Sequence, residues 1–450
     1  MNMSKADVTI VGAGVAGLTL GYQLARAGRR VRVIESAEQV GGLARTSQYD
    51  GFTFDTGPHR FYTNDQRVTD FILGVLGDQA LTISMSSGVL FLGRYYRWPL
   101  GLETVTKLPP LIMLRAAFDL VHRCKREGQS FKDYILNRYG PTLYELDFGP
   151  YTEKFLGLDP AEIHQDWAKA GINRAVIDEK INISSLSQVI KTTFQRKKPL
   201  TLLYPRDGIS VFSEHLREGI ESTGGEVHVG AAVTGLDHTG DRIDSVCFNG
   251  RAVAVDQLVW TAPITHLARL LGLPTADLDF LSSVLCYVRL RGEPPLPYQW
   301  CYFVDADVCI SRIYIPNLLS PSHAPQGKYG ICAEVTCRQG DACWRRPDQV
   351  ARQVIDDLLR TGQIRREDDV EGVSTQLLPD TYPVYHLRYR EELGEVCGRL
   401  SRFRNLGLSG RSGLYWYNNM DHSIHNALAV SQHLLNGGQP CELTRSDVCF

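Results

Sequence analysis

The strand–glycine–helix pattern near the N-terminus places the strongest constraint on the fold of this chain. Residues Val8–Val11 form a short β-branched run, and Gly12, Gly14 and Gly17 follow it with the spacing G-x-G-x-x-G. Such a run predicts a buried strand that turns sharply into a helix. Gly12 permits the tight turn, Gly14 lets the backbone approach a pyrophosphate, and Gly17 lets helix and strand pack closely. The segment therefore predicts a Rossmann-type dinucleotide-binding unit.

The residues that follow complete this unit. The pattern predicts a helix from Leu18 that stops near Gly28, and then a second strand, Val31–Ile34, which ends in Glu35. An acidic residue roughly 20 residues after the third glycine accepts hydrogen bonds from a ribose. The N-terminus of the first helix offers free N–H groups and a positive dipole end to the phosphates.

Length and composition exclude several classes of protein. A chain of 450 residues is long enough for two domains with an additional insert. A formal net charge of -2 gives no indication of a nucleic-acid partner. The sequence contains no apolar run long enough to span a membrane and no signal-peptide pattern. Eleven cysteines without a C-x-x-C pair or zinc spacing favour reduced thiols, no metal site and a cytoplasmic location.

A second glycine motif distinguishes between dinucleotides. Gly41 and Gly42 are followed by Leu43, Ala44 and Arg45. A glycine pair followed by an arginine can wrap its backbone around the junction of a pyrophosphate and a flavin. This pattern resembles the second glycine motif of the amine oxidase, protoporphyrinogen oxidase and phytoene desaturase flavoproteins. The resemblance implies FAD rather than NAD as the cofactor.

Further motifs extend the resemblance over nearly the whole chain. Gly57–Asn64, Arg94–Leu100 and Tyr151–Gly157 are similar to segments of UDP-galactopyranose mutases and of the protoporphyrinogen-oxidase-like proteins near them. Gly410 and Arg411, followed by Tyr415–Asp421, resemble the C-terminal flavin segment of that family. The chain is thus identified as a member of the FAD-dependent amine oxidase superfamily. It departs from the mutases at Asn418 and Asn419, and in the residues that follow Arg312.

The resemblance implies an α/β fold with a Rossmann-type FAD-binding domain, a mixed-sheet substrate domain and a helical insert. We expect the FAD-binding domain to be discontinuous, with residues 1–70, 200–265 and 400–440. Residues 71–199 are expected to form a helical and loop-rich insert, and residues 266–399 the substrate-binding domain.

The candidate site residues come from these motifs. The residues expected to bind the cofactor are Gly12, Gly14, Ala16, Gly17, Glu35, Gly42, Leu43, Ala44, Arg45, Pro58, His59, Val233, Gly410, Asn419, Met420 and Asp421. The residues expected to bind substrate are Trp98, Arg312, Tyr415, Tyr417 and Asn418, and catalysis is assigned to His59, Arg312 and Tyr415.

Each assignment to the substrate side has a chemical reason. His59 sits in a stiff Gly-Pro-His turn that the family places at the flavin, and a histidine can titrate near neutral pH. The planar fork of Arg312 suits a diphosphate or a carboxylate. Tyr415 and Tyr417 alternate along an extended stretch, which predicts that they share one face. A helix expected to begin near Met420 can point N–H groups at the flavin pyrimidine.

Three classes of function remain open from the sequence. The first is a mutase-like enzyme acting on a sugar or nucleotide-linked sugar, with ring opening and reclosure through an adduct at N5 of reduced flavin, as the resemblance implies. The second is an FAD-dependent oxidase or dehydrogenase of a sugar, an amine or a C–C bond. The third is a non-catalytic flavoprotein. In each enzymatic case the partner is a small molecule, such as a nucleotide sugar or glycoside, and two copies of the chain can be expected to associate as a homodimer.

Overall fold

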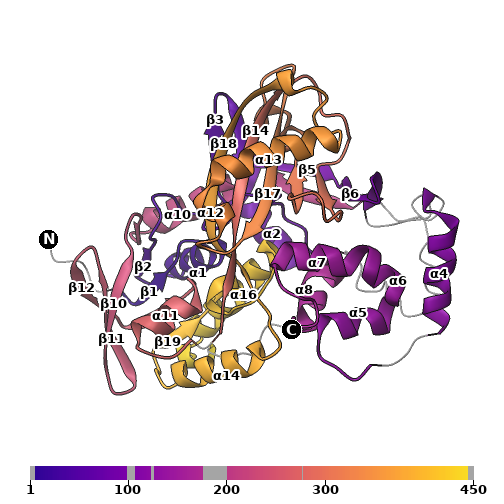
Figure 1. Ribbon diagram of the computed structural model, residues 1–450. Helices are drawn as coiled ribbons and strands as arrows, with labels where there is room; N and C mark the ends of the chain where they lie inside the picture. Colours follow the sequence, from indigo (N-terminus) through magenta and orange to yellow (C-terminus); the bar gives the residue numbers. More distant parts are fainter. Residues whose placement is uncertain (1–5, 99–106, 123–125, 176–199, 276, 444–450) are drawn as a thin grey trace.

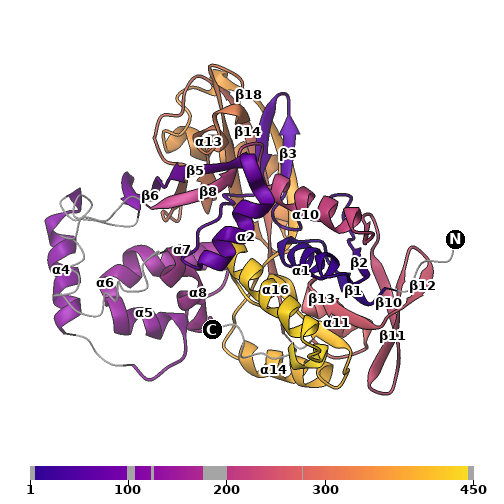
Figure 2. The same cartoon turned by 180° about the vertical axis from the view of Figure 1, so that it is seen from behind.

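The computed structural model describes residues 6–98, 107–122, 126–175, 200–275 and 277–443. Residues 176–199 of the expected insert, and the last two residues of the 94–100 motif, lie outside this range. A parallel sheet with its helices, a large mixed sheet and a helical part make up the molecule, and the helical part lies to one side of the two sheets (Figures 1 and 2).

The parallel sheet confirms the predicted Rossmann-type unit. Its five strands run in the order β19-β13-β1-β2-β9, and every neighbouring pair is parallel. The strands are β1 (Val8–Val11), β2 (Val31–Ile34), β9 (Glu226–His228), β13 (Gln257–Trp260) and β19 (Leu406–Leu408). All four residues of β1 and of β2 are buried, because a parallel sheet is covered on both faces.

Helices from distant parts of the chain cover this sheet. On one face, α1 (Val15–Arg26), α10 (Ser210–Ser222) and α16 (Met420–Leu435) share one apolar core. The other face packs in a second core with a small antiparallel sheet and two helices. These elements are β10 (Val233–Thr239), β11 (Arg242–Phe248), β12 (Arg251–Ala254), α11 (Ile264–Leu270) and α14 (Tyr389–Leu400).

The large sheet is mixed, as expected for the substrate domain. Its order is β18-β14-β17-β16-β15-β6-β7; β6 pairs with β15 in parallel, and the other neighbours are antiparallel. The strands are β6 (Ser87–Phe91), β7 (Arg94–Trp98), β14 (Phe280–Arg291), β15 (Trp300–Phe303), β16 (Arg312–Tyr314), β17 (Lys328–Cys337) and β18 (Val370–Pro383). Helices α12 (Ala342–Arg345) and α13 (Pro347–Arg360) lie against this sheet.

The boundaries of the insert differ from the expected 71–199. Strands β6 and β7 belong to the large sheet because β6 finds its partner in β15. Helix α2 (Gln66–Leu76) packs on the core of the parallel sheet through Ile72 and Leu76. The helical part therefore begins after β7. It contains α4 (Pro110–Val121), α5 (Phe131–Tyr139), α6 (Pro141–Leu143), a π-helical turn (Tyr144–Phe148), α7 (Gly149–Leu156) and α8 (Asp166–Ala175).

Two short antiparallel ladders lie outside the larger sheets. One joins β3 (Thr46–Tyr49) to β4 (Phe52–Asp55), and the other joins β5 (Ala80–Ser84) to β8 (Thr201–Pro205). Asp55, at the end of β4, is fully buried and accepts hydrogen bonds from Tyr204 Oη (2.6 Å), Thr46 Oγ1 (2.7 Å) and the N–H of Ile209 (3.0 Å). Burial raises the pKa of Asp55 to about 6. This cluster anchors the strand that leads into the Gly-Pro-His turn.

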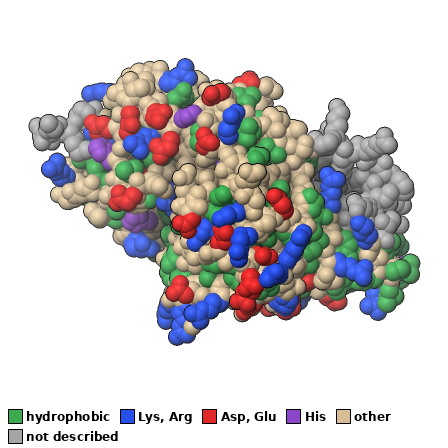
Figure 3. All heavy atoms as spheres, turned by 90° about the horizontal axis from the view of Figure 1, so that it is seen from above, with side chains coloured by type: hydrophobic (Ala, Val, Ile, Leu, Met, Phe, Trp, Pro, Cys, Tyr) green, Lys and Arg blue, Asp and Glu red, His purple; other side chains and the backbone are tan. Residues whose placement is uncertain are grey.

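The surface shows no large field of one sign in the view of Figure 3, where acidic and basic side chains are interspersed. This agrees with the formal net charge of -2. Among the described residues, none of the helices combines the length and apolar character that crossing a bilayer requires.

Asp166 ties the helical part to α14. Its carboxylate is fully buried and accepts hydrogen bonds from Tyr389 Oη (2.6 Å), Lys169 Nζ (2.9 Å) and Arg390 Nε. Burial opposes its charge, but these bonds and one with His164 hold the pKa of Asp166 well below its usual range.

We predict that Asp166→Ala lowers the free energy of unfolding by about 3 kcal/mol, because it leaves a buried hydroxyl and two cations without their shared acceptor. Urea denaturation followed by circular dichroism measures the change. The control is Glu391→Ala, which removes an exposed ion pair with Arg388 and should change stability by less than about 0.5 kcal/mol. Equal effects of the two substitutions would contradict this role of Asp166.

Candidate active site

A cavity of about 680 Å³ lies where the parallel sheet meets the large mixed sheet. The ends of β1, β2 and β13 line it from one side, and residues of β16 and β18 from the other. The structure brings most of the candidate residues to its wall: Gly12, Gly14, Ala16, Glu35, Gly42, Leu43, Ala44, Arg45, Pro58, His59, Val233, Arg312, Gly410, Tyr417, Asn418, Asn419, Met420 and Asp421. Gly17, Trp98 and Tyr415 are not among the lining residues.

The two glycine loops form a backbone cradle. A Cβ atom on Gly42 would lie 3.0 Å from Gly14 Cα, and a β-bridge joins Gly14 to Gly41. A Cβ on Gly14 would meet only Gly42 Cα, at 3.8 Å, so the space in front of Gly14 belongs to the cavity. Gly12, in contrast, has a φ of 104°, and a Cβ there would lie 2.4 Å from Thr261 Oγ1.

Gly17 has the packing role that its position in the motif predicts. A Cβ on this residue would lie 2.0 Å from the carbonyl oxygen of Gly12. Any side chain would therefore push α1 away from the turn that follows β1. Gly17 therefore allows α1 to pack closely against the glycine loop, but it does not itself line the cavity.

Glu35 holds the first glycine loop in place. Its Oε2 accepts the N–H of Ala13 at 2.7 Å, and its Oε1 accepts the N–H of Ala37 at 2.9 Å. The carboxylate lines the cavity at the end of β2 and is 8% exposed. Ser36 Oγ also donates to Oε1, at 3.3 Å. A carboxylate has about four acceptor positions, so capacity remains for a hydroxyl group of a ribose.

Donors converge on the same cavity from elsewhere. The Nε of Arg45 is buried without a hydrogen-bond partner in the protein. The first turn of α1 has no side-chain cap, so its N–H groups are free to bind an anion. The N-terminus of α16 also reaches the cavity, at Asn419, Met420 and Asp421.

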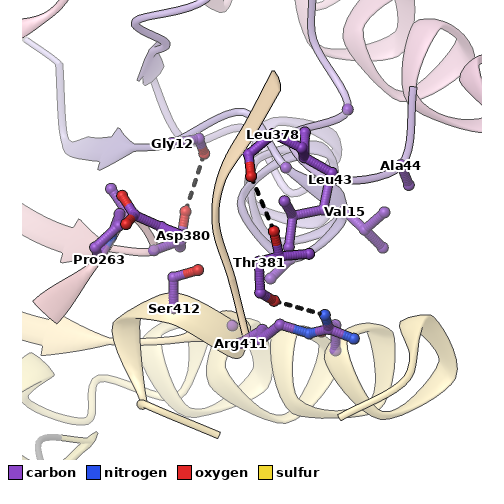
Figure 4. Close-up of a pocket in the computed structure, with 18 of the residues that line it drawn as sticks. Gly12, Val15, Leu43, Ala44, Pro263, Leu378, Asp380, Thr381, Arg411 and Ser412 are labelled. Atoms are coloured by element: carbon purple, nitrogen blue, oxygen red, sulfur yellow. Dashed lines mark hydrogen bonds between the residues drawn. The ribbon is translucent and has the colours of Figure 1, made fainter. Parts of the chain in front are cut away.

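The part of the cavity wall around His59 is rich in arginine. His59 and Arg312 converge beside Gly57: a Cβ on this glycine would lie 3.7 Å from His59 Cε1 and 3.8 Å from Arg312 Nη2. Arg60 lies 4.4 Å from the ring centroid of Trp300 and donates to the carbonyl of Pro58 at 2.8 Å. Arg411 donates to the carbonyl oxygens of Thr381 and Asn418 (Figure 4 shows the former bond).

Arg312 is held in a fixed orientation. Its Nε forms an ion pair with Glu334, a carboxylate whose side chain is 4% exposed, and its Nη2 donates to Tyr382 Oη at 2.6 Å. Glu334 in turn accepts hydrogen bonds from Ser283 Oγ and Tyr382 Oη. A single buried carboxylate thus orients the arginine toward the cavity.

His59 is neutral over the physiological range. Burial, and then the guanidinium groups of Arg312, Arg411 and Arg60, lower its pKa to about 3. Its Nδ1 is buried without a hydrogen-bond partner in the protein. The prediction that His59 titrates near neutral pH is therefore wrong, because three cations and desolvation disfavour the imidazolium.

Comparisons with known proteins agree with this geometry. The family model described as "Flavin containing amine oxidoreductase" matches residues 15–430. The chain belongs to this family. Its cofactor is FAD, as the second glycine motif indicates.

Individual relatives of this flavoprotein have several activities. A probable UDP-galactopyranose mutase of Klebsiella pneumoniae is 27% identical over 36% of the chain, and the match spans 44% of that relative's length. A hydroxysqualene dehydroxylase of Rhodopseudomonas palustris is 28% identical over 66% of the chain and 70% of its own length. The crystal structure of a reduced UDP-galactopyranose mutase superimposes with a TM-score of 0.83 at 19% identity, covering 98% of this chain and 97% of the other. A putative protoporphyrinogen oxidase from Exiguobacterium gives 0.74 at 18% identity, covering 97% and 100%.

The described residues fit FAD. The open space at Gly14, the free acceptor capacity of Glu35, the unpartnered Nε of Arg45 and the two helix N-termini provide what a dinucleotide and a flavin require. The flavoprotein would hold the pyrophosphate at the glycine cradle and the ribose at Glu35.

Tyr415 and Trp98 do not lie where the sequence suggested. Tyr415 has a φ of 51° and sits in a turn, so the expected strand-like alternation with Tyr417 does not occur. Its side chain is 1% exposed, and its hydroxyl donates to the carbonyl of Val384 at 2.8 Å. Trp98 packs against a small apolar cluster that contains Val89 and Tyr96.

Tyr417, in contrast, lines the cavity, and neighbouring aromatic residues hold it in place. Its ring stacks on Trp167 at a centroid distance of 5.0 Å and an angle of 14°. Its N–H donates to Tyr385 Oη at 2.7 Å. The Tyr385 ring stacks on the ring of Tyr389, whose hydroxyl donates to Asp166. The helical part therefore positions this cavity residue.

Several cavity residues were not predicted from the sequence. Arg60 directly follows His59 in the Gly-Pro-His-Arg turn, and its position in the motif was the signal that could have revealed it. The end of β18, Leu378–Tyr382, contributes an entire wall. Nothing in its sequence pattern distinguishes it, because only the pairing of β14 with β18 brings it to the cavity.

We predict that Gly14→Val abolishes FAD binding while the protein still folds, since the new side chain enters the cavity rather than the protein core. The flavin-to-protein absorbance ratio after purification measures the effect. Gly394→Val, at an uncrowded glycine of α14, is the matched control and should retain its flavin. A yellow Gly14→Val protein with full occupancy would show that the cradle is assigned wrongly.

We predict that His59 contributes to a loss of the free energy of unfolding as the pH is lowered. Its pKa is lower in the folded protein than in the unfolded chain, so its stabilising contribution is complete above pH 6.5 and is lost as the pH falls toward 3. Between pH 7 and pH 5 the free energy of unfolding should fall by about 1–2 kcal/mol more in the wild type than in His59→Gln. Urea titrations with saturating FAD measure this. Exposed His122→Gln is the control, and parallel curves for wild type and His59→Gln would refute the prediction.

Proposed function

We propose that this flavoprotein acts on a nucleotide-linked sugar by mutase-like chemistry, in which the sugar ring opens and recloses without net oxidation. The observation that carries the proposal is the cluster of Arg60, Arg312 and Arg411 around His59 in the cavity wall. The same cavity can then hold two diphosphates, one at the backbone cradle and one at the arginines.

The charge balance supports an anionic substrate. Arg411 donates to the carbonyl oxygens of Thr381 and Asn418, and Arg60 donates to the carbonyl oxygen of Pro58. The carboxylate of Glu334 forms an ion pair with Arg312, and Asp421 in the cavity wall interacts electrostatically with Arg60, so the three arginines still outnumber these two carboxylates. The excess positive charge attracts a diphosphate, and a planar guanidinium binds phosphate oxygens with two parallel hydrogen bonds.

The neighbouring side chains suit a sugar. The rings of Tyr382 and Tyr417 lie 5.7 Å and 5.3 Å from the Arg411 guanidinium carbon, so aromatic faces and cations alternate along one wall. Neutral His59 offers one ring nitrogen to substrate or cofactor without adding charge. In mutase-like chemistry, reduced flavin supplies a nucleophilic nitrogen, and the protein binds the diphosphate and keeps the sugar in place.

A second candidate function is the net oxidation or reduction of a substrate in the same cavity. The relative that aligns over the larger part of the chain, 66%, is the hydroxysqualene dehydroxylase. In this case flavin takes part in a net redox reaction, and an electron acceptor or donor is consumed with each turnover.

Stoichiometry distinguishes the two candidates. The holoprotein is reduced anaerobically with one equivalent of dithionite and incubated with UDP-galactose, UDP-glucose or their N-acetyl derivatives. Mutase-like chemistry predicts many ring-isomerised product molecules per reducing equivalent. Product formation that stops after one turnover, or that consumes an acceptor stoichiometrically, would favour the oxidoreductase and contradict the proposal.

We predict that Arg312→Lys weakens the binding of UDP to the holoprotein by roughly 10- to 100-fold, because lysine keeps the charge beside Glu334 but loses the bidentate fork. FAD should remain bound. Isothermal titration with UDP measures the affinity. Arg289→Lys, in the same sheet but paired with Ser374 and Asp50 outside the cavity, is the control. Unchanged UDP affinity in Arg312→Lys would remove this arginine from the substrate site.

A further inference from the structure

Helix α4 presents an apolar stripe to the outside of the molecule. Leu111, Leu114, Phe118 and Val121 are 61%, 69%, 61% and 64% exposed, and α4 has no buried residue. Their spacing of three and four residues places them along one face of the helix. Large apolar side chains exposed in a row indicate an interaction surface, whereas single ones do not.

The shape of the surface restricts its partner. α4 lies at the outer rim of the helical part, as both ribbon views show. The apolar face is thus an outward-facing ridge on one helix, and Leu114 and Phe118 also border a shallow groove beside it. A ridge of 12 residues, about 18 Å long, suits a flat and deformable surface better than a folded protein with a complementary cleft. It is too short to cross a bilayer.

The charged side chains around the ridge indicate that the partner surface is negatively charged. Exposed Arg115 lies beside the stripe, Lys107 lies before the helix, and Arg126 follows the helix next to exposed Glu127. The carboxylate of Asp119 accepts the N–H of Thr142 at 2.8 Å, which turns it toward α6 and away from the stripe. The right-hand end of the molecule in Figure 3 likewise shows hydrophobic side chains next to basic ones.

We propose that α4 docks this protein onto an anionic lipid surface. The helix lies parallel to the membrane with Leu111, Leu114, Phe118 and Val121 in the boundary between headgroups and acyl chains. The aliphatic part of Arg115 lies along this apolar layer while its guanidinium reaches the lipid phosphates. Exposed Glu145, which shares a shallow groove with Leu114 and Phe118, weakens the attraction to anionic lipid.

Vesicle flotation of the full-length holoprotein tests the proposal without any assay of activity. Vesicles are made of phosphatidylcholine alone or with roughly one third phosphatidylglycerol. We expect the protein to float with the anionic vesicles and to be released by salt. Leu114→Ser/Phe118→Ser should lower the bound-to-free ratio by at least about tenfold, since two buried apolar side chains are lost. Arg115→Glu should weaken binding, and Glu145→Gln should strengthen it.

Leu387→Ser removes another exposed leucine, at a distance in sequence from α4, and should float like the wild type. Flavin content and circular dichroism show whether each variant is folded. Absence of the wild type from anionic vesicles would overturn the proposal. A wild-type dimer that Leu114→Ser/Phe118→Ser converts to a monomer, with no flotation of either protein, would assign the ridge to a second copy of the chain instead.

Discussion

The close approach of two backbone turns, at Gly14 and Gly42, is the constraint on which the rest of the site depends. The turns meet so closely that a Cβ on Gly42 would lie 3.0 Å from Gly14 Cα. Backbone N–H groups can therefore face a pyrophosphate without intervening side chains. Glu35 stabilises this arrangement through the N–H of Ala13, because it holds the turn at the end of β2. The large sheet then closes the cavity from the other side.

Buried charges determine how the two halves of the cavity differ. Asp55 anchors the strand that leads into the Gly-Pro-His turn, and Glu334 orients Arg312 above it. Each carboxylate is desolvated but hydrogen-bonded, so both act as rigid anchors. Burial, together with the arginines, lowers the pKa of His59 and keeps it neutral. The half of the cavity near His59 is therefore cationic, whereas the half near Gly14 offers backbone donors and one carboxylate.

The sequence predicted the dinucleotide half well because its function depends on local backbone geometry. A strand, three glycines and a helix must follow one another directly, and β1 and α1 occur where the pattern predicts them. The other half depends on long-range pairing. The wall at Leu378–Tyr382 exists because β18 pairs with β14, and β6 joins the large sheet through β15. Neither pairing leaves a local signature.

The prediction that Tyr415 and Tyr417 share one face of an extended segment failed for a related reason. The two residues were expected on one face of an extended segment, but a turn at Tyr415 places its ring in the core. A positive φ at a tyrosine arises from the surroundings, here the bonds of its hydroxyl to the backbone of Asp279 and Val384. Helix α14 and the helical part then fix Tyr417 at the cavity.

We propose that one cavity binds FAD at the glycine cradle and an anionic substrate at the arginines. A crystal structure of the reduced holoprotein with UDP tests it most directly. We expect the FAD pyrophosphate at Gly14 and Gly42, and the UDP phosphates within hydrogen-bonding distance of Arg60 or Arg312, on the side of His59. UDP phosphates bound elsewhere, or a flavin ring that fills the arginine end and leaves no room for them, would contradict it.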